Sequence, residues 1–133
     1  MKKDLWLNLP VKDVKRTKAF FTSLGATFND GPGDTDHSAC MLVGTKQTVV
    51  MFFEEKMFEG FTGLPLVDAN TSAQVLMSVG ADTREEVDQI AAAANAAGAN
   101  VFAPPMEIQG SMYSCAFADL DGHRWNVLFM EPR

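Results

Sequence analysis

Few side chains in this sequence belong to the types that usually carry chemistry. The two histidines, His37 and His123, have no fixed spacing to cysteines or carboxylates, so they are a weak signal for a metal site. His123 follows Gly122 in a predicted turn, where we expect it to be exposed to solvent. Asp119 and Asp121 flank the same turn, and their carboxylates are expected to accept hydrogen bonds from its backbone.

The remaining reactive residue types also lack a recognisable arrangement. Cys40 and Cys115 lie at similar places in the two halves of the chain, and in a cytoplasmic protein both are most simply free, buried thiols. A disulfide or a reactive thiol is the alternative. Glu85 and Glu86 lie in the first turn of a predicted helix, where carboxylates stabilise the macrodipole. The motifs of serine hydrolases, P-loop proteins, dinucleotide-binding folds and zinc peptidases are absent.

Length and composition narrow the class of protein. The chain has 133 residues, of which 47% are hydrophobic and 21% charged, and this suits one compact domain. The net charge is −6 and there is no basic stripe, so we expect no nucleic-acid partner. No run of apolar residues is long enough to span a membrane, and the N-terminus lacks the apolar core of a signal peptide. These features predict a cytoplasmic protein that does not bind membranes.

The elements that must position any site follow one order twice. In the first half, residues 5–9 alternate in polarity as a strand does, and Asp13 is a predicted helix N-cap before an apolar stripe that ends at Gly25. In the second half, Thr83 and Glu86 form a capping box, and the helix ends at Gly98. The other strands are predicted at residues 26–28, 38–43, 48–53, 73–79, 99–102, 112–118 and 124–130.

This order predicts an α+β fold of two tandem βαβββ units. We expect the eight strands to form a curved mixed sheet around a cavity, with the helices on its outer side. Residues 57–71 form a connecting segment that is too apolar for a free linker. It is expected to pack either on the body of the protein or on a second subunit, and we predict a homodimer.

Two sequence motifs carry a resemblance to a known family. They are N-L-P-V-K-D-V followed by A-F-F-x-x-L-G near the start, and F-A-D-L-D-G-H-R-W-N-V-L near the end. The second is similar to F-x-D-P-D-G-x-x-x-E-[LIV], and together they resemble the vicinal oxygen chelate superfamily of glyoxalases, bleomycin resistance proteins and extradiol dioxygenases. The resemblance covers the chain as one domain, residues 1–133, with unit one at about 1–56 and unit two at about 72–133.

The resemblance also identifies the positions where the enzymes of this superfamily hold a divalent metal with His and Glu. They fall on Trp6, Gln74 and Asn126, and on Val50 or Met51, where the register is open by one residue. None of these residues is a histidine or a carboxylate, and a lone amide oxygen is a poor ligand. We therefore expect no cofactor, with a divalent metal on non-standard ligands as the alternative.

Strand alternation predicts which side chains line the cavity. They are Trp6, Asn8, Gln74, Tyr113, Cys115, Arg124 and Asn126. Such a set orients a small planar or amphipathic molecule by stacking and a few hydrogen bonds. Tyr113 could donate a proton and Arg124 could bind a carboxylate. The alternative is that these residues only fill an inner core.

The function predicted from the sequence is binding of a small molecule in the cavity between the two units, without the family metal. The alternative is a metal-dependent lyase, isomerase or dioxygenase of the same superfamily with non-standard ligands. A third possibility is an assembly or regulatory subunit, which no sequence feature tests.

Overall fold

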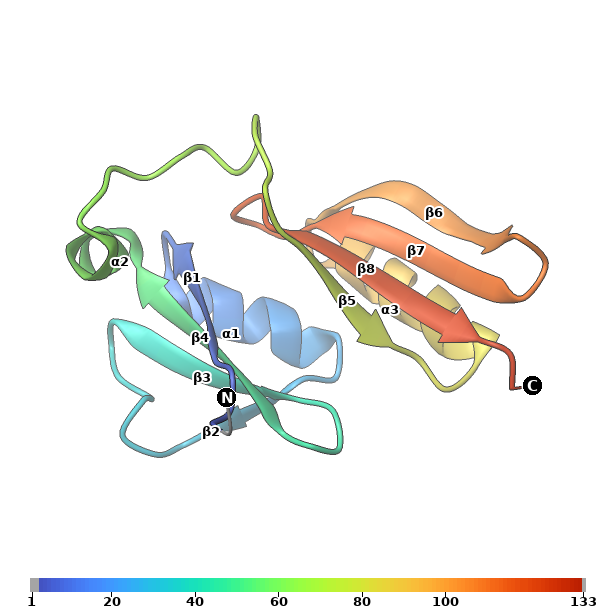
Figure 1. Ribbon diagram of the computed structural model, residues 1–133, viewed down its shortest axis with the longest axis horizontal. Helices are drawn as coiled ribbons and strands as arrows, with labels where there is room; N and C mark the ends of the chain where they lie inside the picture. Colours follow the sequence, from blue (N-terminus) through green and yellow to red (C-terminus); the bar gives the residue numbers. More distant parts are fainter. Residues whose placement is uncertain (1–2, 133) are drawn as a thin grey trace. The chain divides into compact units, whose positions relative to one another are not determined.

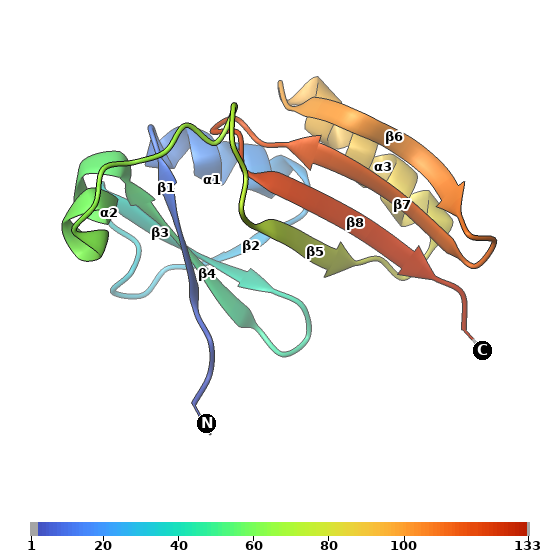
Figure 2. The same ribbon diagram turned by 45° about the horizontal axis from the view of Figure 1, so that its top comes forward.

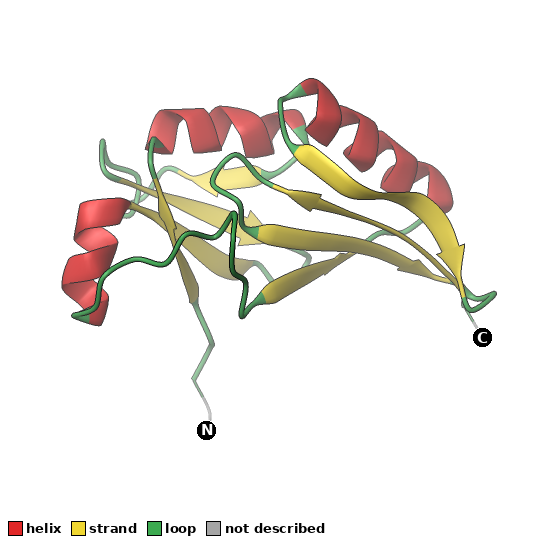
Figure 3. Ribbon diagram, turned by 90° about the horizontal axis from the view of Figure 1, so that it is seen from above, coloured by secondary structure: helices red, strands yellow, loops and turns green. Residues whose placement is uncertain are grey.

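The protein consists of two compact units, and the computed structural model describes residues 3–132. Unit one ends at Val67 and unit two begins at Asp68, so the boundary lies within the predicted connecting segment. Each unit contains a four-stranded sheet with a helix packed against one face (Figure 1). Figure 3 shows the same division of helices and strands by colour.

Unit one contains five elements of the βαβββ order and one further helix. They are β1 (Leu7–Val11), α1 (Val14–Ser23), β2 (Thr27–Asn29), β3 (Ser38–Val43), β4 (Thr48–Glu54) and α2 (Glu55–Thr62). The strands lie in the order β1-β4-β3-β2, with β1 parallel to β4 and the other pairs antiparallel.

Helix α1 begins and ends where the sequence predicts. The side chain of Asp13 accepts a hydrogen bond from the backbone N–H of Arg16 at 3.2 Å, which satisfies one of the free donors at the helix start. Gly25 adopts a φ of 94°, a left-handed conformation that glycine tolerates best. Phe21 stacks on Phe52 of β4, with 5.2 Å between ring centroids. The buried residues of α1 are Val14, Thr17, Phe20 and Phe21.

Unit two repeats the topology. It contains β5 (Leu76–Gly80), α3 (Arg84–Ala96), β6 (Asn100–Ile108), β7 (Met112–Ala118) and β8 (Arg124–Met130). The strand order is β5-β8-β7-β6, with β5 parallel to β8 and the other pairs antiparallel. The predicted α+β fold of two tandem βαβββ units is confirmed. The eight strands are divided between two four-stranded mixed sheets, one in each unit.

The predicted capping box is present at the start of α3, with one difference. The Thr83 side chain accepts a hydrogen bond from the backbone N–H of Glu86 at 3.1 Å. The Glu86 carboxylate accepts in return from the N–H of Asp82, at 3.2 Å, rather than from Thr83 itself. The helix buries a narrow stripe of Val87, Ala91 and Ala94 against β6, β7 and β8.

Strand β6 is longer than predicted. The strand predicted at residues 99–102 was expected to end before Pro104 and Pro105, yet it continues to Ile108. Proline is tolerated here because β6 is the edge strand of its sheet and its pairing with β7 shifts register on both sides of Ala103.

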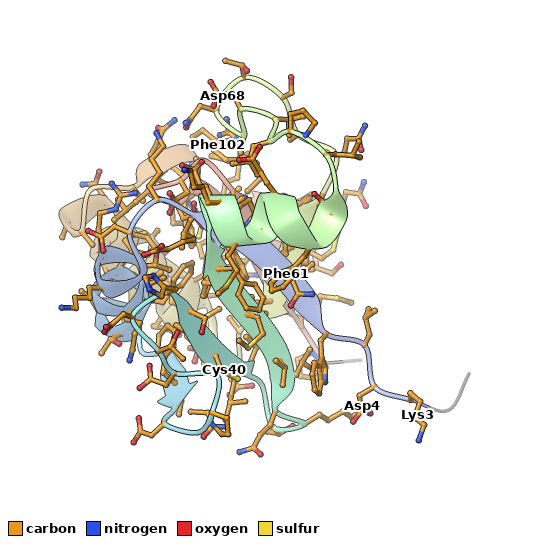
Figure 4. The ribbon with its side chains drawn as sticks, turned by 90° about the vertical axis from the view of Figure 1, so that its left-hand side faces the viewer. Lys3, Asp4, Cys40, Phe61, Asp68 and Phe102 are labelled. Carbon is orange, nitrogen blue, oxygen red and sulfur yellow. The ribbon has the colours of Figure 1, made fainter. Side chains whose placement is uncertain are left out.

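Helix α2, which was not predicted, begins just before the connecting segment and takes up its first residues. Phe53 and Phe61 pack edge to face with 5.0 Å between their ring centroids, so α2 covers part of the face of unit one opposite α1. Figure 4 shows Phe61 on the side of α2 that is turned toward β4. Residues 63–75, which join α2 to β5, form no helix or strand (Figure 2).

The helices of the described part of the chain are all too short or too polar to cross a membrane.

Candidate ligand-binding site

The sheet of unit two has one face covered by α3 and one face turned away from it. The covered face presents Cys115, Phe117, Trp125 and Val127, which are all buried. Because neighbouring residues of a strand point to opposite faces, Arg124 and Asn126 of β8 lie on the other face with Leu76 and Ser78 of β5.

One row of paired residues crosses this uncovered face. Leu76 pairs with Arg124, Arg124 with Ala118, and Ala118 with Asn100. Because Ala118 has a short side chain, the long side chain of Arg124 can extend over it toward β6. The guanidinium carbon of Arg124 lies over the ring of Phe102, 4.8 Å from the ring centroid. Cation and ring at this separation attract each other.

An open hollow of about 700 Å³ surrounds this contact. It is lined by Ala73, Gln74, Val75, Leu76, Asn100, Phe102 and Arg124. The lining combines apolar walls, one exposed aromatic ring, two amides and one guanidinium. A surface of this kind can hold a small organic molecule by apolar contact and fix its orientation with a few polar groups.

Arg124 differs from the arginine on the other face of the same unit. The guanidinium of Arg84 is bonded to Glu131 at 2.9 Å and to Glu107 at 2.7 Å, and these carboxylates, Glu131 first, raise the pKa of Arg84. Within residues 3–132, Arg124 forms no ion pair with a carboxylate, and it is the one charged side chain among the lining residues. Its N–H groups are therefore available to a ligand.

Asn126 lies on the same face, one row further along β8. Its Nδ2 donates a hydrogen bond to Oγ of Ser78 at 3.3 Å. Of the seven predicted pocket residues, the structure thus brings Gln74, Arg124 and Asn126 to one face of unit two. Whether they bind a ligand stays a prediction.

Tyr113 and Cys115 share a face, as predicted, but it is the face covered by α3. The Tyr113 hydroxyl donates to Asp88 of α3 at 2.6 Å, and Cys115 Sγ lies 3.8 Å from the carbonyl oxygen of Val87. The hydrogen bond to Asp88 raises the pKa of Tyr113, and burial raises the pKa of Cys115 to about 11. Their prediction as residues of the uncovered face is wrong, because β7 pairs Cys115 with the buried Val127.

Trp6 and Asn8 belong to unit one. Trp6 is 63% exposed and precedes β1, because the strand that was predicted to begin at residue 5 begins at Leu7. Asn8 is exposed in β1 and pairs with Met51, on the face turned away from α1.

The strand register corrects one of the four expected metal positions. Asn126 pairs with Ser78, and the repeat that aligns Val79 with Val11 places Ser78 opposite Pro10 of unit one. Pro10 pairs with Phe53, so Phe53 is the counterpart of Asn126, and the expectation of Val50 or Met51 is wrong. An indole, an amide of Gln, an amide of Asn and a phenyl ring do not fit a divalent cation.

Other side chains of the described chain do not replace these ligands. No group of three or more His, Cys, Asp or Glu within residues 3–132 is arranged to hold a metal ion. His37 Nδ1 lies 2.9 Å from Glu54 Oε2, but this exposed pair has no third ligand of those types. The absence of a family metal remains a prediction.

The turn that follows β7 owes its shape to Asp119, as expected. Its Oδ1 accepts hydrogen bonds from the backbone N–H groups of Asp121 and His123, and its Oδ2 accepts one from Trp125 Nε1, each at 3.0 Å. Burial raises the pKa of Asp119, while these hydrogen bonds and His123 act in the opposite direction. His123 is half-buried rather than exposed. This cluster orders the start of β8 and therefore positions Arg124.

Both cysteines are free and buried, which confirms the simpler prediction for them. Cys40 pairs with Met51, on the face opposite α1, whereas Cys115 lies under α3. They therefore do not occupy equivalent places in the two units.

Sequence reasoning missed two residues that define the hollow, Asn100 and Phe102. Both were assigned to a short strand, and no face was given to them. The signal that could have found them is their spacing of two residues on a strand whose neighbour, β7, carries the small Ala118 opposite Asn100.

The fold and the motifs define the class of protein. The family model of the Glyoxalase/Bleomycin resistance protein/Dioxygenase superfamily matches residues 5–127, and the chain belongs to this superfamily. The resemblance stated from the sequence is confirmed.

Several solved structures are similar to this chain. The chain is similar to the hypothetical protein SA1046 from S. aureus, with 34% identity, a TM-score of 0.85 and coverage of 97% of this chain and 95% of that one. It shares its fold with a family enzyme from Burkholderia phytofirmans PsJN (19% identity, TM-score 0.81, 97% and 100% coverage). The fosfomycin resistance protein FosX from Listeria monocytogenes is a further match (19%, TM-score 0.68, 98% and 95%). No curated protein matches the chain.

Proposed function

We propose that this protein binds a small organic molecule in the hollow of unit two, on the sheet face turned away from α3. The observation that carries the proposal is the position of Arg124. It lies over the exposed ring of Phe102, lines the hollow and has no carboxylate partner within the described residues. A guanidinium held by an aromatic ring rather than by a carboxylate keeps its N–H groups available for a ligand.

The other lining residues suit the same role. Gln74 and Asn100 each offer an amide, which can both donate and accept hydrogen bonds. Val75 and Leu76 are exposed apolar side chains at the edge of the hollow, where contact with a ligand would remove their surface from water. The combination supports binding and orientation and offers no evident general base.

The proposal includes binding without the family metal. It is supported by the donor set, since neither unit supplies a histidine or carboxylate at the expected positions. Elemental analysis of protein purified without a metal-affinity tag tests this part. Near-stoichiometric metal, with a thermal stability that rises with added Ni, Zn, Mn or Fe, would overturn it.

The site is tested by ligand-observed NMR with a library of small aromatic and aliphatic fragments, followed by titration against the 15N-labelled protein. Fragments that bind should shift the amide resonances of residues 73–76, 100–102 and 124. The variant Phe102→Ala should raise the dissociation constants of these fragments at least several-fold. Arg84→Gln is the matched control, because Arg84 lies on the face covered by α3 and should leave binding unchanged. Binding that shifts other residues, or that survives Phe102→Ala unchanged, would refute the site.

We also propose that the protein acts as a homodimer in the cytoplasm. Support for the dimer comes from the segment after β4, where Phe61, Leu64 and Val67 are exposed apolar side chains at 65%, 68% and 78%. Sedimentation that gives a monomer of about 14.5 kDa at micromolar concentration would contradict the dimer.

A further inference from the structure

We infer that the ligand of this hollow is a planar molecule with one negatively charged group, such as an aromatic or conjugated carboxylate. This inference rests on the proposed function, because it names the class of ligand that the same site takes. Charge and shape support it separately.

The charge of the hollow is opposite to that of the whole protein. The chain carries a net charge of −6, yet Asp and Glu are absent from the described residues that line the hollow, and Arg124 carries its charge. A positive group without a nearby carboxylate is a local attraction for an anion within a surface that otherwise repels one.

The geometry of Arg124 favours a carboxylate among anions. The guanidinium carbon of Arg124 lies 4.8 Å from the centroid of the Phe102 ring, and a guanidinium carries its N–H donors in one plane as a fixed fork. Two of these donors match the spacing of the two carboxylate oxygens, which gives a bidentate pair. Because no carboxylate within residues 3–132 pairs with Arg124, these donors remain available to such a ligand.

The remaining walls favour a flat body attached to that carboxylate. Phe102 is 47% exposed, so part of its ring remains accessible to a second planar group. Ala73, Val75 and Leu76 supply an apolar edge, and the amides of Gln74 and Asn100 can bond a polar substituent on the ring. A small inorganic anion would leave these apolar groups in water, and an aliphatic carboxylate would not use the ring.

Three probes that share one ring system and differ in charge separate the contribution of charge from that of shape. They are 2-naphthoate, the neutral 2-naphthamide and the cationic 2-naphthylmethylammonium. Titrations followed by 15N–1H NMR should give the naphthoate a dissociation constant at least tenfold lower than that of the amide. The cation should have the highest dissociation constant of the three. Acetate at the same concentrations should bind far more weakly than naphthoate. The naphthoate affinity should fall as salt is raised from 50 to 500 mM.

Variants of Arg124 test whether its side chain causes the preference for naphthoate over naphthamide. Arg124→Gln should remove the preference for naphthoate over naphthamide while the amide still binds, and Arg124→Lys, which keeps the charge but not the paired donors, should retain only part of it. Arg84→Gln should keep the full preference. A naphthamide that binds as tightly as naphthoate at these residues would overturn the charge class and leave the proposed site standing. If acetate binds as well as naphthoate, the planar class is wrong, and if no probe binds in the hollow, both the inference and the proposed site fail.

Discussion

The two units place different residues at equivalent positions of their two sheets. In unit two, the row that crosses the uncovered face contains Leu76, Arg124, Ala118 and Asn100. In unit one, the matching row contains Asn8, Met51, Cys40 and Asn29. The methionine of one copy therefore stands where the other has its free arginine.

The surroundings of these two residues differ as well. A Cβ built on Gly33 would lie 3.1 Å from the terminal methyl of Met51, so the loop before β3 already lies against this methionine. Phe61 of α2 covers the neighbouring Phe53. In unit two, by contrast, Arg124 meets the exposed ring of Phe102 beside an open hollow.

This difference indicates how one repeat can serve two purposes. Unit one covers the free face of its sheet with its own loop and helix, which adds apolar contacts and stability. On the corresponding face of unit two, Arg124 has no carboxylate partner within the described residues, and its guanidinium is available for recognition. The following predictions test this division, beginning with the largest expected effect.

Two neighbouring phenylalanines in β4 test the two faces of unit one. Phe52 is fully buried against α1, whereas Phe53 is half-buried under α2. Phe52→Ala should lower the free energy of unfolding by about 3–5 kcal/mol, as large cavities in cores do, and Phe53→Ala by about half as much. Denaturant titration followed by circular dichroism measures both values. Equal losses would mean that α2 covers its face as tightly as α1 covers the other.

Two glycines with nearly the same backbone angle test how closely each unit packs its turns. Gly25 has a φ of 94° with open space around it, and Gly122 has a φ of 90°. A Cβ at Gly122 would lie 2.6 Å from the Asn70 side chain and 2.9 Å from the Ala69 backbone. Gly25→Ala should cost about 1–2 kcal/mol from the left-handed conformation alone.

Gly122→Ala should cost more than Gly25→Ala, because the segment at residues 69–70 must also move away from the turn. Thermal unfolding compares the melting temperatures of the two variants. Gly122→Ala, but not Gly25→Ala, should also weaken ligand binding at Arg124. Equal melting temperatures would show that residues 69–70 do not constrain this turn.

The buried thiol of unit two predicts a dependence on pH. Burial raises the pKa of Cys115 to about 11, so the unfolded chain ionises this thiol at a lower pH than the native protein does. The stability that Cys115 contributes is complete below the ordinary pKa of a thiol and is lost as the pH rises toward about 11. Relative to Cys115→Ala, the wild type should therefore lose stability over this alkaline range.

The matched control for that measurement is Cys40→Ala, which keeps Cys115 and should keep the alkaline loss. Alkylation by iodoacetamide at pH 8 should also leave Cys115 unmodified in the native protein and modify it in denaturant. Rapid native alkylation of Cys115 would contradict its position under α3.

Local sequence rules were sufficient for most of the fold, because caps and alternation act over a few residues. Asp13, Thr83, Gly25 and Gly98 delimit the two long helices as predicted. Helix α2 was missed because no side chain caps its start at Glu54, so the sequence carries no start signal there. The extension of β6 was missed because a proline pair ends most strands and is tolerated only at a sheet edge, which is a property of the tertiary structure.

The site was predicted less completely, because alternation within a strand does not fix which face each strand presents. Arg124 and Asn126 were placed through Trp125 and Val127, the buried residues of their own strand. Gln74 precedes β5, and it lines the hollow together with its exposed neighbour Val75. Tyr113 and Cys115 required the register between β7 and β8, which depends on long-range pairing. Counting back from the turn at Asp121 and Gly122 would have paired Cys115 with Val127 and placed it under the helix.

The smallest predicted effect concerns the two helix starts. Asp13→Ala and Thr83→Ala each remove one side-chain acceptor from a backbone N–H and should each cost about 1 kcal/mol. At the start of α3, a second bond joins the N–H of Asp82 to the Glu86 carboxylate, so Glu86→Ala should cost a further few tenths of a kcal/mol.

A double-mutant cycle of Thr83→Ala and Glu86→Ala, measured by denaturant titration, tests whether the two bonds of this cap support each other. We expect a coupling in unit two, since the two side chains hold the same turn of backbone from both sides. Lys15→Ala, an exposed residue near the start of α1, is the control for unit one and should show no coupling with Asp13→Ala. Strictly additive losses at Thr83 and Glu86 would mean that the two bonds act independently.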